Sequence, residues 1–298
     1  MSPTTSPTTP ADSPTAPTGT APTAVRPDDA RTAPALALTI AGSEATGGAG
    51  AQADLKTFQE LGVYGMVSLT CIVSFDPADN WNHRFFPVPT QVQREQLAAI
   101  QGDYPQTLRT VKLGMQGSPE TIRVTADALD AQPWDHVVLD PVLICKGQEP
   151  GHALDTDQAL TAELLPRATF ITPNHFETEQ LSGMSVGSVE ELEAAARRIH
   201  EISGAAVLAK GGMNLSGTDA VDVFVDEDTV EVLSAPKVGD AGVSGAGCTL
   251  AAVVTAELAR GATPLEAARR AKAFVHAGIG QALSGETPFA ALWQGGLR

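Results

Sequence analysis

A glycine-rich turn that leads into an apolar run is the segment of this chain best suited to hold a phosphate group. Residues 244–250 read Ser-Gly-Ala-Gly-Cys-Thr-Leu, so Gly245, Ala246 and Gly247 would lie at the start of a helix. Backbone N–H groups there have no partner within the helix, and together with the helix dipole they attract an anion. The turn therefore predicts a phosphate site, although an ordinary strand-to-helix connection has a similar composition.

Cys248 occupies the first turn of the same predicted helix. A thiol near a helix N-terminus tends to have a lowered pKa, because the positive end of the dipole stabilises the thiolate. The position is compatible with a general base beside the bound anion. Spacing alone favours the alternative of a small buried side chain, which is the commonest environment of a single cysteine.

Two segments place carboxylates at the ends of predicted strands. Asn174 and Glu177 offer oxygen atoms within the sequence Thr-Pro-Asn-His-Phe-Glu, and Asp140 begins a segment that also contains Cys145 and Lys146. Mg²⁺ prefers a few protein oxygens, with water and substrate phosphates as its other ligands, so Asn174 and Glu177 suit a metal held through the phosphates of ATP. The pair formed by Asn174 and Glu177 is equally typical of a helix cap with a solvated glutamate.

A fourth candidate is the glycine-rich loop, residues 42–50, which is followed by Asp54. It resembles a nucleotide-binding loop, yet it lacks the Gly-Lys-Ser/Thr ending of a P-loop and a regular GxGxxG pattern. Its glycines are equally compatible with tight packing of the backbone. The loop alone therefore does not identify a ligand.

Apolar runs that alternate with amphipathic segments would position these residues. Strands are expected at 36–41, 67–74, 136–144, 168–173 and 205–210, and a hairpin at 220–235. Helices are expected at 51–62, 90–100, 160–165 and 189–202, with two more from Gly247 and Pro264. Nearly continuous apolar strands between amphipathic helices indicate an α/β fold with a mainly parallel sheet that is covered on both faces.

Composition limits the classes of function. The 298 residues are 43% hydrophobic and carry a net charge of −16, which is enough apolar material for one large domain and argues against a nucleic-acid or anionic-membrane surface. Three widely spaced cysteines without a CxxC pattern indicate neither a disulfide framework nor a structural zinc site. No apolar run is long enough to span a membrane, so a cytoplasmic protein is expected.

The first 34 residues are rich in Pro, Thr, Ser and Ala and have few large apolar side chains. Such a segment cannot bury enough surface to offset the entropy of ordering, so we expect a disordered tail at 1–34 and a single folded domain at 35–298. A transit peptide is the alternative, but the acidic residues Asp12, Asp28 and Asp29 argue against it.

Taken in order, four segments resemble the ribokinase-like superfamily, and within it the pyridoxal kinases related to hydroxymethylpyrimidine kinases. They are AGSEATGGAGAQADLKTFQELGVYGM, DPVLICKG, ITPNHFE and SGAGCT, and the similarity runs from Leu36 to Gly280. The resemblance implies a three-layer sandwich, a homodimer, and transfer of phosphate from ATP, with Mg²⁺, to the hydroxymethyl group of pyridoxal, pyridoxine or pyridoxamine.

The resemblance also implies roles for particular residues. The vitamin pocket would be lined by Gly42, Ser43, Asp54, Phe75, His83, Met115 and Cys145. The nucleotide side would comprise Asn174, Glu177, Lys210, Gly211, Gly212 and Gly247, with Mg²⁺ held through water at Asp140 and Glu177. The catalytic group would comprise Cys248, Cys145 and the anion-binding residues Gly245, Ala246 and Gly247.

Two alternatives remain open beside pyridoxal kinase activity. One is a hydroxymethylpyrimidine or phosphomethylpyrimidine kinase, although Phe75 stands where those relatives carry a glutamine that reads the pyrimidine. The other is a catalytically weak pyridoxal-binding protein, because Glu44 and Ser244 depart from the family pattern, as Gln116 also does. The persistence of the phosphate turn and the Asn174–Glu177 pair favours an enzyme.

Overall fold

The computed structural model describes residues 33–143, 150–239 and 241–296. Pro34–Arg298 form one compact unit. Residues 1–32, which are most of the tail expected at 1–34, lie outside the described residues. Cys145, which the family resemblance assigns to the substrate pocket, also lies outside them.

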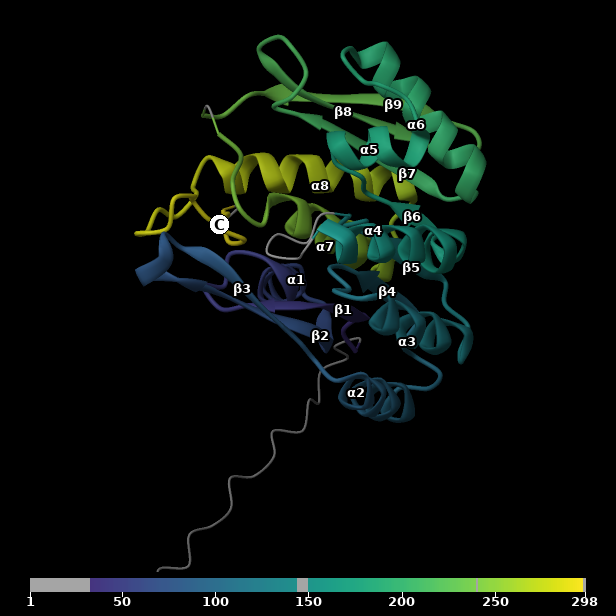
Figure 1. The fold of residues 1–298 in the computed structure, drawn as a ribbon. Helices are drawn as coiled ribbons and strands as arrows, with labels where there is room; N and C mark the ends of the chain where they lie inside the picture. Colours follow the sequence, from purple (N-terminus) through teal and green to yellow (C-terminus); the bar gives the residue numbers. More distant parts are fainter. Residues whose placement is uncertain (1–32, 144–149, 240, 297–298) are drawn as a thin grey trace, which may run out of the picture. The chain divides into compact units, whose positions relative to one another are not determined.

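A nine-stranded sheet forms the centre of the described part of this unit (Figure 1). Strands β2, β1, β4, β5, β6 and β7 are parallel neighbours, while β3, β8 and β9 extend the sheet as antiparallel strands. In spatial order the strands are β3 (Asn82–Pro87), β2 (Tyr64–Asp76), β1 (Leu36–Glu44), β4 (Thr110–Leu113), β5 (His136–Leu139), β6 (Phe170–Ile171), β7 (Ala206–Gly212), β8 (Asp219–Val225) and β9 (Val230–Pro236).

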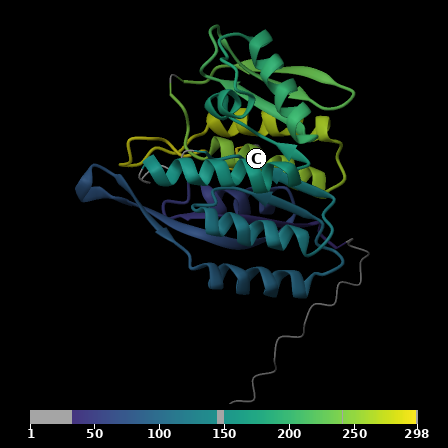
Figure 2. The same ribbon diagram turned by 45° about the vertical axis from the view of Figure 1, so that its right-hand side comes forward.

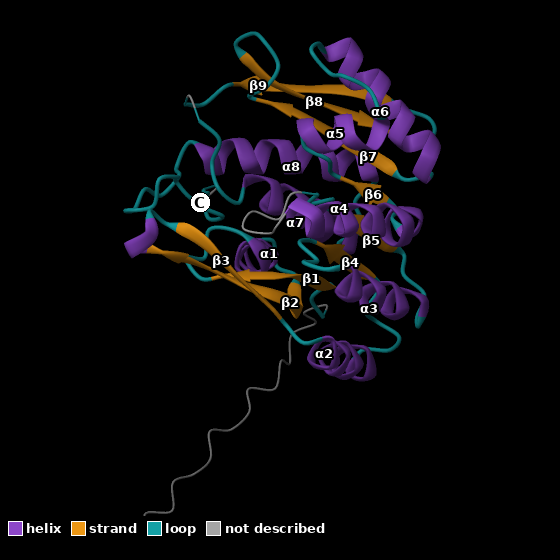
Figure 3. Cartoon of the chain, in the orientation of Figure 1, coloured by secondary structure: helices purple, strands orange, loops and turns teal. Residues whose placement is uncertain are grey.

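Helices cover both faces of the sheet, as the views in Figures 1, 2 and 3 show. One layer contains α1, α7 and α8, and α7 packs directly over β1, β4 and β5. The other contains α2 to α6. The helices are α1 (Gly50–Glu60), α2 (Thr90–Asp103), α3 (Pro119–Asp130), α4 (Pro150–Ala159), α5 (His175–Ser182), α6 (Val189–Ser203), α7 (Ala246–Ala259) and α8 (Pro264–Ile279). None of those in the described ranges is long and apolar enough to cross a bilayer. The predicted α/β class is confirmed.

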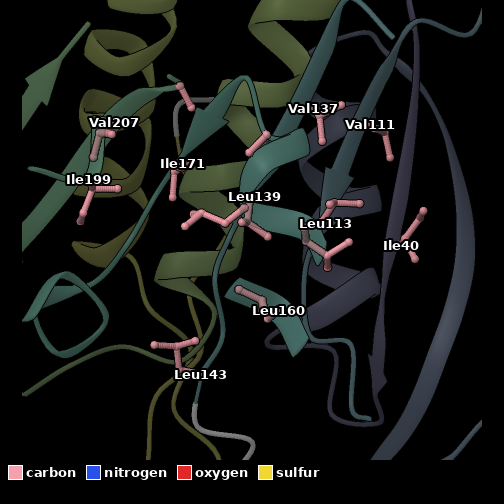
Figure 4. Packing of buried hydrophobic residues seen from close by; sticks show 14 of the residues in the cluster. Ile40, Val111, Leu113, Val137, Leu139, Leu143, Leu160, Ile171, Ile199 and Val207 are labelled. Atoms are coloured by element: carbon pink, nitrogen blue, oxygen red, sulfur yellow. The ribbon is translucent and has the colours of Figure 1, made fainter. Parts of the chain in front are cut away.

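Side chains alternate between the two faces of the central strands, so adjacent rows of residues enter different layers. Ile40, Leu113, Leu139 and Ile171 are consecutive register partners across β1, β4, β5 and β6. All four are buried in one apolar cluster with Leu160, and Figure 4 shows their packing. The neighbouring row faces α7 and contains Val138 and Phe170, which belong to a second cluster. The sheet is therefore buried on both faces, as the apolar strand sequences predict.

Several element boundaries differ from the sequence-based expectation. The sequence-based order, in which the helix at 90–100 is followed directly by the strand at 136–144, is wrong. Strand β4 and helix α3 lie between them. The strand at 136–144 ends at Leu139, and the expected helix at 160–165 is a π-helical continuation of α4. Strand β4 has only four residues and includes a fully buried lysine, so it lacks the apolar run that indicates a strand.

Leu139 tests the central packing because it is fully buried on β5. Leu139→Ala should lower the free energy of unfolding by about 2–5 kcal/mol, since it removes apolar contacts and leaves a cavity. Val232→Ala on β9, where the native side chain is 48% exposed, should change it by less than about 0.5 kcal/mol. Urea unfolding of both variants checks this, and equal midpoints would contradict the assigned packing.

Candidate active site

The candidate residues gather at one edge of the sheet, where the parallel strands end. Strand β1 has β2 on one side and β4 on the other, so the order of strand addition reverses between β1 and β4. In open α/β sheets, ligands bind outside the carboxyl ends of strands at such a switch point. Met115, Asp140 and Asn174 follow β4, β5 and β6 at this edge, and Lys210 lies near the end of β7.

The turn before α7 depends on Gly245. This residue is the N-cap of α7 and has a φ of 79°, which is a left-handed conformation that favours glycine. A Cβ atom at this position would overlap the carbonyl oxygen of Gly48 in the glycine-rich loop. No side chain caps the helix. The Ala246 N–H donates to the Val243 carbonyl oxygen at 3.3 Å, whereas the Gly247 and Cys248 N–H groups lie in the first turn, where amides have no partner within the helix. The geometry predicted for an anion site is therefore present at Gly247 and Cys248.

Lys210 contributes a positive charge beside this turn. Its Nζ lies 3.4 Å from the position that a Cβ on Gly247 would occupy, and 3.4 Å from Oδ1 of Asp140. The side chain is only 13% exposed. Asp140 and Glu177 raise its pKa, which burial alone would lower. A cation held this way can contact a phosphate bound at the start of α7.

Asn174 and Glu177 form a reciprocal helix cap and also a buried acidic site. Asn174 Oδ1 accepts a hydrogen bond from the Glu177 N–H at 2.9 Å, and Glu177 Oε2 accepts one from the Asn174 N–H at 2.7 Å. The glutamate is 5% exposed, so the alternative of a solvated glutamate is wrong. Burial, and then repulsion from Asp140, raise its pKa to about 7. The cap thus holds a carboxylate that would gain from a nearby cation.

The Cys248 thiol has a raised pKa in the ligand-free protein, contrary to the expectation from its position at a helix start. Burial raises the pKa to about 11, and the Lys112 ammonium opposes this effect. The Gly50 N–H also lowers it through a hydrogen bond to the sulfur. The residue as a whole has intermediate exposure. Desolvation therefore has a larger effect on the pKa of Cys248 than the dipole of α7.

Glu44 organises the glycine-rich loop. Its Oε2 accepts hydrogen bonds from the Gly48 and Ala49 N–H groups at 2.9 and 3.1 Å, and its Oε1 accepts from the N–H and hydroxyl of Thr46. The carboxylate lies inside the loop and is 7% exposed. This departure from the family pattern therefore holds the backbone that packs against Gly245.

Gly42 and Ser43, which the resemblance assigns to the vitamin pocket, lie on β1, and Met115, assigned to the same pocket, follows β4. A Cβ on Gly42 would lie 2.5 Å from Cys71 Sγ and 3.6 Å from Met115 Sδ, so the backbone passes close to both sulfur atoms. Ser43 Oγ accepts a hydrogen bond from Gln52 at 2.7 Å. The close packing explains why a glycine is required at position 42.

An aromatic group forms at the neighbouring β2–β3 hairpin. Phe75 and His83 are opposite each other in the hairpin, and their ring centroids are 4.5 Å apart at an interplanar angle of 70°. Phe289, from the C-terminal segment, lies 5.2 Å from Phe75. Sequence reasoning selected the first two residues but missed Phe289, which lies outside the recognised motifs and meets them only through the fold.

Asp54 does not lie at the protein surface. It is fully buried and its Oδ2 is 3.0 Å from Nζ of Lys112, which is also fully buried. This arrangement places Asp54 beneath the site, whereas the resemblance placed it at the wall of the pocket. Sequence reasoning did not select Lys112. The signal in the sequence that could have identified Lys112 is its position between apolar residues, which predicts a buried charge.

Gly211 and Gly212 form the irregular end of β7, where the pairing with β8 shifts register. A Cβ on Gly211 would lie 2.5 Å from the carbonyl oxygen of Val221, and Gly212 has a φ of 51°. Close packing at position 211 and the backbone conformation at position 212 therefore favour glycine, independently of the predicted place of both residues on the nucleotide side.

A cavity of about 370 Å³ opens on the other side of the glycine-rich loop. Its walls come from that loop, α1 and the C-terminal segment, and they include Lys56 and Trp293. Neither residue belongs to the predicted site. Across the described ranges, no group of three or more His, Cys, Asp and Glu side chains is arranged to hold a metal ion by itself.

Comparison with known proteins identifies the relatives of this chain. The phosphomethylpyrimidine kinase family matches residues 44–289. Pyridoxine kinase of Bacillus subtilis is 46% identical over 248 residues, which cover 82% of this chain and 89% of that protein. The ADP complex of Bacillus subtilis pyridoxal kinase superimposes with a TM-score of 0.83 at 43% identity, covering 89% of this chain and 99% of the other.

Pyridoxal kinase from Staphylococcus aureus in complex with AMP-PCP and pyridoxal gives a TM-score of 0.81 at 37% identity. The superposition covers 89% of this chain and 95% of that one. These similarities confirm the predicted ribokinase-like three-layer fold.

Gly245→Ala tests the close approach at the α7 turn. The left-handed conformation costs a non-glycine residue roughly 1–2 kcal/mol, and the overlap with Gly48 adds to it. Thermal unfolding should therefore occur at a clearly lower temperature than in the parent. Gly242→Ala is the matched control, since a Cβ there meets no atom within 4 Å. Equal unfolding temperatures for the two variants would contradict the geometry.

Proposed function

The chain belongs to the phosphomethylpyrimidine kinase family, and we propose that it transfers the γ-phosphoryl group of ATP to the hydroxymethyl group of pyridoxal, pyridoxine or pyridoxamine. The observation that carries this proposal is the similarity to pyridoxine and pyridoxal kinases along most of both chains. The product would be pyridoxal 5′-phosphate or the corresponding phosphorylated vitamer.

The start of α7 supports the phosphoryl-transfer part of the proposal. We place the transferring phosphoryl group at the turn formed by Gly245, Ala246, Gly247 and Cys248, where the Gly247 and Cys248 N–H groups and the Lys210 ammonium can contact it. Phosphoryl transfer requires mainly positioning and stabilisation of charge on the equatorial oxygens. Uncapped amides and a shielded cation supply both in a fixed arrangement.

Cys248 is proposed as the base. The substrate hydroxyl oxygen bonds to the γ-phosphorus while the bond from phosphorus to the β,γ-bridging oxygen breaks, and ADP leaves with that electron pair. The hydroxyl proton passes to the Cys248 thiolate. A thiol with a raised pKa is a strong proton acceptor once it is ionised, and the residue as a whole has intermediate exposure.

Mg²⁺ is proposed to bind through water at Asp140 and Glu177. These two buried carboxylates repel each other and have one nearby ammonium, that of Lys210, as a described counter-charge. A divalent cation would relieve the excess negative charge, and a site with two carboxylates suits Mg²⁺ that keeps water and phosphate ligands. The bound ion would neutralise charge on the triphosphate.

Phe75 supports a pyridine substrate in preference to a pyrimidine. Its ring packs between His83 and Phe289 and presents no hydrogen-bonding group to a heterocycle. We assign Gly42, Ser43, His83 and Met115 to the same vitamin pocket. Asn174, Gly211 and Gly212 are assigned to the nucleotide side, and the role of Cys145 stays a prediction.

We also propose a cytoplasmic homodimer with a single kinase domain at residues 35–298. The compact unit formed by Pro34–Arg298 supports the single domain, the free thiols of Cys71 and Cys248 suit the compartment, and the homodimer rests on the family resemblance alone. A reducing compartment suits both thiols. Sedimentation of the purified chain at micromolar concentration tests the dimer.

Product formation tests the proposed function. MgATP is offered with pyridoxal, pyridoxine, pyridoxamine and hydroxymethylpyrimidine separately, and phosphorylated product is measured by mass spectrometry. Preference for the three pyridines supports the proposal. Preference for the pyrimidine would replace it with the hydroxymethylpyrimidine kinase alternative. Tight pyridoxal binding without product would support the weak binding protein instead.

Replacing Cys248 tests the proposed base. In Cys248→Ala, kcat should fall by about 10²–10³, since a positioned base contributes factors of this order. The parent kcat/KM should rise with pH between 7 and 9, because the raised pKa leaves the thiol mostly protonated there. That rise should be absent in the variant. A variant that keeps most of the parent turnover would contradict the assignment.

Replacing Phe75 tests substrate choice. Phe75→Gln introduces the hydrogen-bonding group that the pyrimidine kinases of this family carry, so the ratio of kcat/KM for hydroxymethylpyrimidine to that for pyridoxal should rise by roughly tenfold or more. Phe86→Gln is the control, because Phe86 is 54% exposed at the edge strand β3. An unchanged ratio in Phe75→Gln would remove Phe75 from the specificity argument.

A further inference from the structure

The segment that follows α8 returns to the turn before α7. The Ser244 N–H donates a hydrogen bond to the Ala290 carbonyl oxygen at 2.8 Å, and the Leu292 N–H donates one to the Ser244 carbonyl oxygen at 3.0 Å. Ser244 and Ala291 therefore form a parallel β-bridge. Because Ser244 directly precedes Gly245, the C-terminal segment is bonded to the residue next to the proposed phosphate site.

Further contacts hold this segment against α7. The Leu292 side chain is 2% exposed and packs with the apolar residues of α7 and α8. The side-chain amide of Gln294 donates a hydrogen bond to the Thr249 hydroxyl on α7 at 3.2 Å. Leu283 and Ala291 exchange two backbone hydrogen bonds, at 2.8 and 2.9 Å. Backbone and side-chain contacts together therefore set the path of the chain here.

The same segment also contacts the β2–β3 hairpin, and it runs beside the hairpin in Figures 1 and 2. The ring centroid of Phe289 lies 5.2 Å from that of Phe75, which in turn lies 4.5 Å from that of His83. The Thr287 hydroxyl donates a hydrogen bond to the Phe289 carbonyl oxygen at 2.9 Å, which fixes the local turn. Phe289 therefore attaches the segment to the hairpin.

The aromatic group lies on the inner face of the hairpin. Side chains alternate along a strand, so Cys71 and Phe75 point to the same face of β2. The Cys71 Sγ lies 3.7 Å from the Met115 Sδ, which connects this face with a second residue assigned to the vitamin pocket. Ile72, on the opposite face, is 46% exposed. Phe289 thus packs on the face of the hairpin that belongs to the site.

The three rings are suited to hold a flat heterocycle. Phe75, His83 and Phe289 are each half-buried, so part of their surface remains accessible. Aromatic side chains pack well against other rings, either stacked with an offset or edge to face. Covering the remaining apolar surface with a bound ring is favourable. A substrate ring would therefore gain from contact with this group.

The C-terminal segment links this group to the turn before α7. Phe289 is two residues from Ala291, so its ring contact and the bridge to Ser244 are about 7 Å apart along an extended chain. A substrate whose ring rests on the hairpin and whose hydroxyl group reaches the phosphate must extend between the same two places. Phosphoryl transfer is sensitive to such distances, because its catalysis relies on positioning.

We propose that Phe289 is a positioning residue for the heterocyclic substrate. Its segment is fixed by the bonds to Ser244, and its ring holds the Phe75 ring in the place from which the substrate hydroxymethyl group reaches the phosphoryl group. The inference rests on the proposed function, since it takes a heterocycle and a phosphate as the two ligands. It gives the C-terminal segment a role in substrate affinity that none of the four sequence motifs carries.

The test is binding of pyridoxal to the full chain, measured by isothermal titration calorimetry. In Phe289→Ala, the Kd for pyridoxal should rise by about three- to tenfold, since an aromatic pair contributes an effect of this order. The Kd for AMP-PCP with Mg²⁺ should stay at the parent value, because Leu292 and Gln294 still hold the segment on α7. An effect on the heterocycle alone distinguishes positioning from a general loss of structure.

Two further variants control for packing. Phe289→Tyr keeps the aromatic ring, so it should bind pyridoxal with the parent Kd. Leu283→Ala changes the same segment, but Leu283 is 54% exposed and pairs with Ala291 through backbone atoms, so both Kd values should equal those of the parent. An unchanged Kd for pyridoxal in Phe289→Ala would overturn the proposal. A matching rise in both Kd values, or loss of folding in both Phe289 variants, would overturn it as well.

The outcome can be separated from that of the proposed function. Pyridoxine, pyridoxamine and hydroxymethylpyrimidine are titrated in the same way, so the effect is measured on whichever heterocycle the parent binds. Weaker heterocycle binding by Phe289→Ala, in a chain that forms no phosphorylated product, would keep this inference and reject the proposed function. Product formation with unchanged heterocycle affinity would do the reverse. A parent that binds none of the four compounds would overturn both.

Discussion

The site depends on the close contact between two backbone segments, Gly245 before α7 and Gly48 in the glycine-rich loop. Any side chain at position 245 would overlap the Gly48 carbonyl oxygen, so the start of α7 can approach the glycine-rich loop this closely only because position 245 is a glycine. Glu44 fixes the loop side of this contact through the Gly48 and Ala49 N–H groups. The amides at the start of α7 and the Cys248 sulfur, which follow directly in the chain, take their positions from it.

Around this contact the protein keeps an unusual number of charges out of water. Lys210 pairs with Asp140 after β5 and also interacts electrostatically with Glu177 on α5, while Lys112 pairs with Asp54 under α7. Buried charges of this kind cost stability, and they occur where a site must shift the protonation of its own groups or attract a charged ligand. The carboxylate side suits a cation and the α7 side suits an anion. This separation matches a nucleotide triphosphate held with its metal.

Sequence reasoning succeeded where local composition determines structure. The apolar runs of β1 and β7, the hairpin of β8 and β9 and the turn before α7 all have strong local signals, and the structure contains each of them. It failed at β4, because a four-residue strand with a buried lysine has no periodic pattern, and it consequently missed Lys112. It also misjudged the Cys248 pKa. A helix start lowers a thiol pKa, but only the packed structure reveals that desolvation is the larger effect.

The most direct test of the central claim is a structure of the protein with MgAMP-PCP and pyridoxal. We predict that the γ-phosphate lies within hydrogen-bonding distance of the Gly247 and Cys248 N–H groups, with the pyridoxal hydroxymethyl group between that phosphate and the Cys248 sulfur. A triphosphate bound elsewhere, for example in the cavity lined by Lys56 and Trp293, would contradict the account.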